Sequence, residues 1–240
     1  MPPEDNVVLS AEFFEKAAFQ ATYINPFFHY LETISKFLND EVQDIQKNTE
    51  TFEKRINSGE IMLKDTHQMP EEIANNEFWL GQFSEFENIL LKSFFVAIYE
   101  FLESQLMQHC RYLEQQNKDI KPSLQDWRNK NNRISRIQQA IKYITEVQRI
   151  DFSLKKYPVE WKKIDNYGPL RNCIVHNEGS VDENFKKNQR NKLNEFIKWK
   201  DSNLQFSNPY VVLTKKFCED SLTTIWEFLW AILSAKVQAG

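Results

Sequence analysis

Apolar side chains recur every three or four residues along most of the chain, which is the spacing of one face of an α-helix. The longest such stretch predicts a helix over residues 83–117, with neither glycine nor proline inside it. Its apolar stripe consists of Phe83, Phe86, Leu90, Leu91, Phe94, Phe95, Ile98, Phe101, Leu102, Leu106, Cys110 and Leu113. A helix of this length is expected to form the spine of the fold.

The residues before this spine also predict helices. One begins at Ala11 with Ser10 as its cap and is interrupted at Pro26. A second covers 27–56. Residues 57–81 mix turn residues and polarity, and we expect an irregular connection there.

After the spine, the pattern predicts further helices. Ser123 is placed to cap a short one, and residues 133–150 carry an isoleucine-rich stripe. Pro158 is suited to the first turn of the next helix, in which Pro169 marks a kink or a fresh start. Thr214 is placed to cap a final helix over residues 215–237.

The segment LQFSNPYVVLT at 204–214 breaks the helical pattern. Two short apolar runs flank a Ser-Asn-Pro turn, which is typical of a β-hairpin. The predicted fold is therefore all-α, a helical bundle with one small β-hairpin before the C-terminal helix. We expect residues 1–82 to form a helical extension packed on a main domain of residues 83–240.

Glycine is scarce, with 5 residues among 240, against an average near 7%. The five are Gly59, Gly81, Gly168, Gly179 and Gly240, and none stand close together. A P-loop or a Rossmann fingerprint needs clustered glycines. Nucleotide binding through a glycine-rich phosphate cradle is therefore excluded, and no cofactor is predicted.

The three cysteines are odd in number and form no CxxC pair, which favours a reducing cytoplasm over a disulfide scaffold. The start, MPPEDN, is acidic and is not followed by the apolar stretch of a secretory signal. Charged residues interrupt every apolar run before it reaches the roughly 18 residues of a membrane span. We expect a cytoplasmic protein without a membrane partner.

Charge is unevenly distributed, although the whole chain carries a net charge of −4. Residues 1–105 hold 7 basic and 19 acidic side chains, whereas residues 118–200 hold 19 basic and 10 acidic ones. Such an asymmetry either marks a face that binds a polyanion or is neutralised within the fold.

The segment LRNCIVHNEG at 170–179 carries the most informative chemistry. At 100° per residue, an arginine, an amide and an imidazole fall on one side of a helix, and an apolar face falls on the other. The polar side holds Arg171, Asn172 and His176, with Val175 among them. Histidine moves protons near neutral pH, and arginine stabilises charge on a phosphoryl group. The alternative is a surface arginine and a histidine at a helix end that Gly179 terminates.

Arg171-Asn172-Cys173-Ile174-Val175-His176 resembles the Arg-x4-His motif of HEPN domains, including the asparagine that often follows the arginine. The surrounding order is similar to that of a bacterial HEPN branch. It comprises a long Phe-rich helix, a Trp-Lys spacer at 160–163, a glycine turn, a hairpin and a last helix. The resemblance covers about 83–237, and the first 80 residues depart from it.

This resemblance implies a helical bundle that pairs into a homodimer and cuts RNA without a metal. Arg171 and His176 of two protomers would meet across the dimer cleft. Arg171 would stabilise the phosphorane, His176 would handle the proton, and Asn172 would orient His176 or the phosphate. The products would be a 2′,3′-cyclic phosphate and a 5′-hydroxyl. Many such proteins act in toxin–antitoxin or phage-defence systems, so an antitoxin or another regulatory protein is an expected partner.

Three other interpretations remain open. A purely structural interaction domain would neither bind nor cut RNA. A non-catalytic HEPN-like module would use the same residues to bind RNA, a nucleotide or a partner protein. A zinc site would combine Cys173 and His176 with His109 and Cys110, but Cys173 falls on the apolar face, which favours a buried structural cysteine.

Overall fold

The computed structural model describes residues 11–58, 69–183, 185–199 and 202–235. Those residues are mostly helical and contain one antiparallel hairpin before the last helix, which confirms the predicted fold class. The elements, in order, are α1 (Ala11–Phe19), η1 (Gln20–Ile24), α2 (Asn25–Asn57), α3 (Met69–Gln116), α4 (Leu124–Lys130), α5 (Arg136–Lys142), η3 (Tyr143–Val147), η4 (Leu154–Lys156), α6 (Pro158–Asn177), α7 (Lys187–Lys198), β1 (Gln205–Ser207), β2 (Tyr210–Val212) and α8 (Lys215–Leu233).

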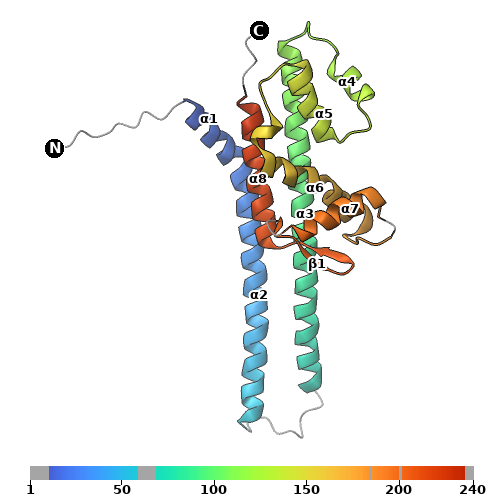
Figure 1. The fold of residues 1–240 in the computed structure, drawn as a ribbon. Coiled ribbons are helices and arrows are strands. Elements are labelled where there is room, and N and C mark those ends of the chain that lie inside the picture. The colour runs from blue at the N-terminus through green and yellow to red at the C-terminus, as the bar shows by residue number, and fades with distance from the viewer. Residues whose placement is uncertain (1–10, 59–68, 184, 200–201, 236–240) are drawn as a thin grey trace, which may run out of the picture.

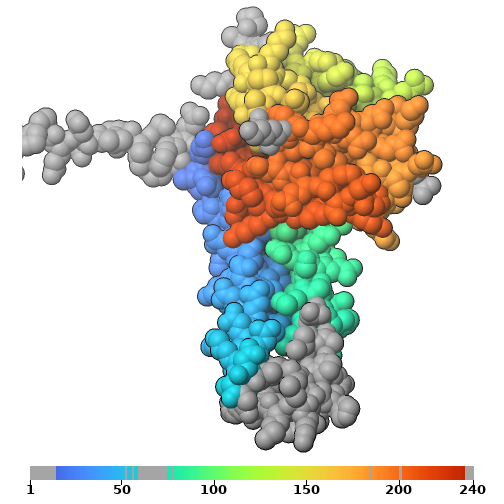
Figure 2. All heavy atoms as spheres, turned by 60° about the horizontal axis from the view of Figure 1, so that its bottom comes forward, coloured from blue at the N-terminus to red at the C-terminus, as the bar shows by residue number. Residues whose placement is uncertain are grey.

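The long helices α2 and α3 lie side by side and project from the rest of the molecule as a stalk (Figures 1 and 2). At the upper end in Figure 1, α8 packs against both of them. The helices α5 and α6 pack on α3, and α7 packs on α6. At 48 residues, α3 spans about 72 Å, so it forms the spine that the apolar pattern predicted.

The core lies where α3, α6 and α8 meet. Phe95, Tyr167 and Phe217 are almost fully buried, and their ring centroids lie 5.4 to 6.1 Å apart in tilted and edge-on contacts. Such aromatic pairs add to the stabilisation that burial of their surface provides. This packing fixes how α6 is turned about its own axis.

Several predicted helix starts agree with the structure. Ser123 accepts a hydrogen bond from the backbone N–H of Asp126, and Thr214 accepts one from Phe217, so both cap their helices. Pro158 occupies the first turn of α6, which runs through Pro169 without ending. The predicted cap at Ser10 lies outside the described residues.

Other boundaries differ from the predictions. The helix α3 begins at Met69, so the second half of the predicted irregular connection over 57–81 is helical; residues 59–68 lie outside the described part. Pro70 falls in its first turn, where proline is tolerated. Pro26 likewise falls in the first turn of α2, and a short π-helical segment, η1, replaces the predicted interruption. The boundary placed between 82 and 83 falls inside α3.

The hairpin pairs Phe206 with Val211 and carries the Ser-Asn-Pro turn where the sequence placed it. The helix α7 was not predicted, because only its Leu193 and Phe196 are buried among many polar residues. Within the described residues, no helix has the length and apolar character needed to cross a membrane.

Candidate functional site

The helix α6 carries the Arg-x4-His segment and buries its other face. Leu170 and Cys173 are fully buried, and the Cys173 thiol donates a hydrogen bond to the Ser180 carbonyl oxygen over 3.2 Å. The helix ends at Asn177, after which Glu178 and Gly179 both adopt positive φ values. This packing leaves the predicted polar side of the helix open.

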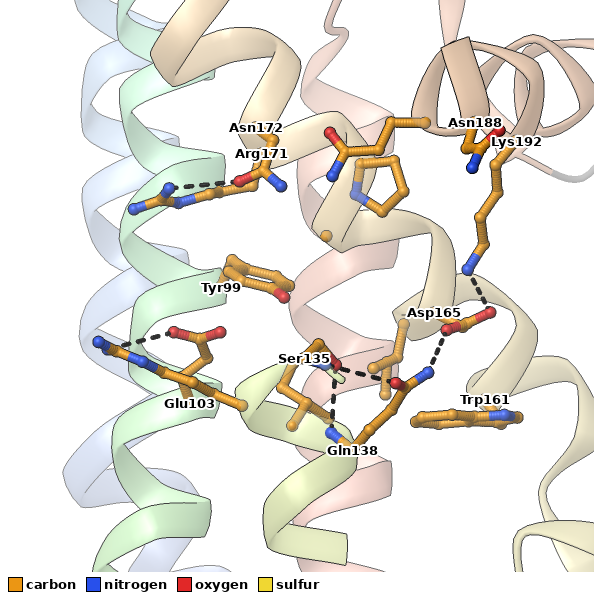
Figure 3. A pocket seen from close by; sticks show the side chains of 16 residues that line it. Tyr99, Glu103, Ser135, Gln138, Trp161, Asp165, Arg171, Asn172, Asn188 and Lys192 are labelled. Carbon is orange, nitrogen blue, oxygen red and sulfur yellow. Dashed lines mark hydrogen bonds and ion pairs between the residues drawn. The ribbon is translucent and has the colours of Figure 1, made fainter. Parts of the chain in front are cut away.

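Arg171 makes two contacts on that open side. Its Nη2 atom lies 3.0 Å from Oε1 of Glu100 on α3, and its Nη1 atom donates to Oδ1 of Asn172 over 3.4 Å. Figure 3 shows the second contact. The Arg171 side chain is 26% exposed and the Glu100 side chain is 56% exposed, so the ion pair is half solvated. Arg171 is therefore held in a defined direction and remains reachable.

His176 lies one helical turn beyond Asn172, about 6 Å along the axis, and its side chain is exposed. No hydrogen bond or ion pair reaches it from the described residues. The amide of Asn172 engages Arg171 instead. One chain thus brings Arg171 and Asn172 into contact but leaves His176 apart from both.

A cavity of about 570 Å³ adjoins Asn172 and is bounded by α3, α5, α6 and α7 (Figure 3). We call it the Trp161 cavity. Its lining combines Trp161 and Tyr99 with polar groups that include Gln138, Asp165 and Lys192. Gln138 donates to Asp165 over 3.1 Å, and Lys192 forms an ion pair with the same carboxylate. These contacts fix one wall of the cavity.

The floor of this cavity depends on Gly168. A Cβ atom at that position would lie 3.2 Å from the Tyr99 hydroxyl oxygen, which is closer than ordinary packing allows. Burial, together with the nearby Glu103 carboxylate, raises the pKa of the Tyr99 phenol. Tyr99 is therefore a neutral hydroxyl at physiological pH.

A second cavity, of about 540 Å³, adjoins the first and is rich in arginine. We call it the arginine cavity. Its charged lining consists of Arg111, Arg128, Arg136, Arg171, Glu100 and Glu103. Arg171, Arg136 and Glu103 line both cavities. The Arg128 Nε atom is buried without a hydrogen-bond partner in the described part of the chain.

The charge in this region is positive although the chain is acidic. Lys192 and four arginines line the two cavities, against Asp165 and two glutamates, so cations exceed anions by two. Burial raises the pKa of Glu103 from its ordinary value. Four of the five cations come from residues 118–200, the stretch whose positive charge the sequence singled out.

A third cavity, of about 980 Å³, lies on the other side of the motif and has a largely apolar lining. Ile89, Val96 and Ala97 of α3 face Ile174 and Val175 of α6 there. Val175 is 44% exposed, as expected from its place among the polar residues of the motif.

The residues considered for zinc do not gather in the structure. Cys110 and Cys173 are buried, and burial raises the pKa of each thiol to about 12. His176 is exposed, whereas Cys173 is buried. Among the described residues, no three histidine, cysteine, aspartate or glutamate side chains are placed to hold one metal ion.

Sequence reasoning missed Tyr99, Glu100 and Glu103, which border the site from α3. These three residues lie within five positions of one another and fall on one side of the α3 helix. Nothing in the sequence indicates that this side packs against α6.

Comparisons with protein-family models, with curated proteins and with solved structures find no match to this chain.

Proposed function

We propose that this protein is a metal-independent endoribonuclease of HEPN type that cuts RNA at a site shared by two protomers. The observation that carries the proposal is the placement of Arg171. It lies on the rim common to two positively charged cavities, on the same open helix side as the unengaged imidazole of His176. Guanidinium groups suit phosphate oxygens, and an exposed imidazole suits proton transfer.

The reaction uses the RNA's own 2′-hydroxyl as the nucleophile. His176 accepts its proton as the 2′-oxygen forms a bond to phosphorus, and Arg171 stabilises the charge that builds on the phosphoryl oxygens. The bond to the 5′-oxygen then breaks, and a protonated His176 of the second protomer delivers a proton to it. The products are a 2′,3′-cyclic phosphate and a 5′-hydroxyl, and Asn172 keeps Arg171 directed at the phosphate.

A homodimer is part of the proposal because one chain does not bring the two groups together. Arg171 and His176 are five residues apart on α6, about 7.5 Å along the axis, and make no contact. The apolar cavity beside the exposed Val175 offers a surface that a second copy would cover. We further propose a cytoplasmic role in a toxin–antitoxin or phage-defence system, in which a regulatory protein restrains the nuclease.

The deciding experiment is cleavage of mixed RNA in excess EDTA. Wild type is expected to leave cyclic phosphate ends, and His176→Ala is expected to lose at least about a hundredfold in rate. His29→Ala is the matched control, because His29 is also exposed but lies on α2, and it should cut at the wild-type rate. Equal cutting by wild type and His176→Ala would refute the proposal, and so would a monomer in sedimentation at the working concentration.

A non-catalytic module that binds RNA, a nucleotide or a partner protein is the second candidate. Two observations favour it: His176 lines neither of the positively charged cavities, and Arg171 is already paired with Glu100. Salt-dependent RNA binding without cleavage, by a dimer supplied with a range of RNAs, would favour this candidate.

A further inference from the structure

We propose that the Trp161 cavity binds one unpaired nucleotide of the RNA, next to the phosphate that is cut, and thereby gives the enzyme a base preference. This inference rests on the function proposed above and names what the same site reads. Its volume of about 570 Å³ lies within the range of cavities that enclose one small ligand.

The aromatic wall of the cavity is rigid. The Trp161 ring stacks on Phe228 with centroids 6.0 Å apart and an interplanar angle of 23°. Phe228 is fully buried, so the indole cannot swing away without disturbing the core. Proteins that bind single-stranded RNA stack its bases on such aromatic faces.

The opposite wall supplies polar groups that are free to bind. Asn188 and Gln189 of α7 line the cavity, and neither amide has a hydrogen-bond partner among the described residues. A carboxamide offers both donors and an acceptor, which matches the mixed pattern on the edge of a base. In contrast, Gln138 and Lys192 are engaged with Asp165 and shape the wall instead.

The cavity also lies along α6 from the residues proposed to cut RNA. Gly168, Asn172 and His176 follow one another at four-residue steps on α6, each step rising about 6 Å. A strand that leaves the cavity therefore passes Asn172 before it reaches His176. Arg136 and Arg171 on the rim shared with the arginine cavity are placed for the flanking phosphates.

The test measures binding separately from cleavage. In a His176→Ala background and excess EDTA, fluorescence anisotropy gives the Kd for labelled oligonucleotides of A, C, G and U. Trp161→Leu is expected to raise the Kd roughly 5- to 150-fold, the range found when a stacking side chain is removed. Trp79→Leu, which changes an exposed tryptophan on the stalk, should alter it less than about twofold.

A second variant avoids any loss of folding at Trp161. Asn188→Ala combined with Gln189→Ala changes partly or fully exposed side chains and should narrow the differences among the four oligonucleotides. If both variants bind like the parent, and the same substitutions in a chain that retains His176 leave the base preference of cleavage unchanged, the inference is wrong and the nuclease stands. If wild type does not cut but the variants lose binding, the nuclease is wrong and the nucleotide cavity stands.

Discussion

The ion pair between Arg171 and Glu100 engages the guanidinium that the proposed reaction needs. Their atoms lie 3.0 Å apart, which corresponds to roughly 1.4 kcal/mol of Coulomb attraction in bulk water and more at lower polarity. Measured exposed ion pairs contribute only about 0.2–1 kcal/mol, because solvent screens them. Since this pair is half solvated, we expect its strength to be about 1 kcal/mol, at the upper end of that range. An RNA phosphate that binds Arg171 has to displace the Glu100 carboxylate or share the guanidinium with it.

Glu100→Gln is therefore expected to tighten RNA binding. Glutamine keeps the shape of the side chain and removes its charge, so the phosphate no longer competes with a carboxylate. The expected gain is roughly three- to fivefold in Kd, and the loss of folding stability is no more than about 1 kcal/mol. Anisotropy with labelled RNA, in the His176→Ala background and EDTA, measures the first, and urea denaturation measures the second.

The control is Glu87→Gln, which removes the same charge from an exposed position on α3, about 20 Å along the helix from Glu100. Its effect on the Kd should be small. Equal tightening by both variants would refute the reasoning, because the cause would then be overall charge. Weaker binding by Glu100→Gln would also refute it, since Glu100 would then be orienting Arg171 toward RNA.

Three further predictions test other parts of the structure. Burial lowers the pKa of His109 in the folded protein, so between that pKa and 6.5 the unfolded chain binds more protons than the folded one. The free energy of unfolding should therefore fall as the pH drops through this window. In thermal melts, His109→Phe should reduce this dependence of stability on pH. In urea denaturation, Gly179→Ala should lower the free energy of unfolding by about 1–2 kcal/mol, because φ is +87° and the new Cβ would lie 2.9 Å from Lys92 Nζ. The Cβ of Gly81→Ala meets no atom within 4 Å, so this variant should stabilise α3 by up to about 1 kcal/mol. Arg111→Ala should lower the slope of log binding constant against log salt by about one in anisotropy titrations, while an unchanged slope would exclude its contact with phosphate.

The sequence predicted the helices well where one face is buried. Phe94, Phe95, Ile98 and Leu102 follow the helical spacing and are buried in the structure. Residues 69–82 are equally helical, but Phe78 and Trp79 there are exposed. Periodicity reports burial more than helix formation, so it missed the stalk end of α3.

The candidate site was predictable only as far as a single helix determines it. Rotation by 100° per residue, with Leu170 and Cys173 buried, places Arg171 and His176 on the open side. The partner of Arg171 lies 71 residues earlier in the chain, so local spacing carries no sign of it. The resemblance implied that Asn172 orients His176 or the phosphate, yet the amide oxygen accepts a hydrogen bond from the neighbouring guanidinium.

The joining of α3 to α8 across a long stretch of chain has a consequence for biosynthesis. Phe95 packs on Phe217, so 122 residues must be translated before the first ring meets the second. At about 5–20 residues per second, this takes roughly 6–25 s. Throughout that interval α8 is not there to cover the apolar side of α3. The helix α6 also lacks its contacts with α8. A nascent chain therefore cannot complete the core around α3 and α6 before α8 is made, and this part of the fold forms only at the end of synthesis.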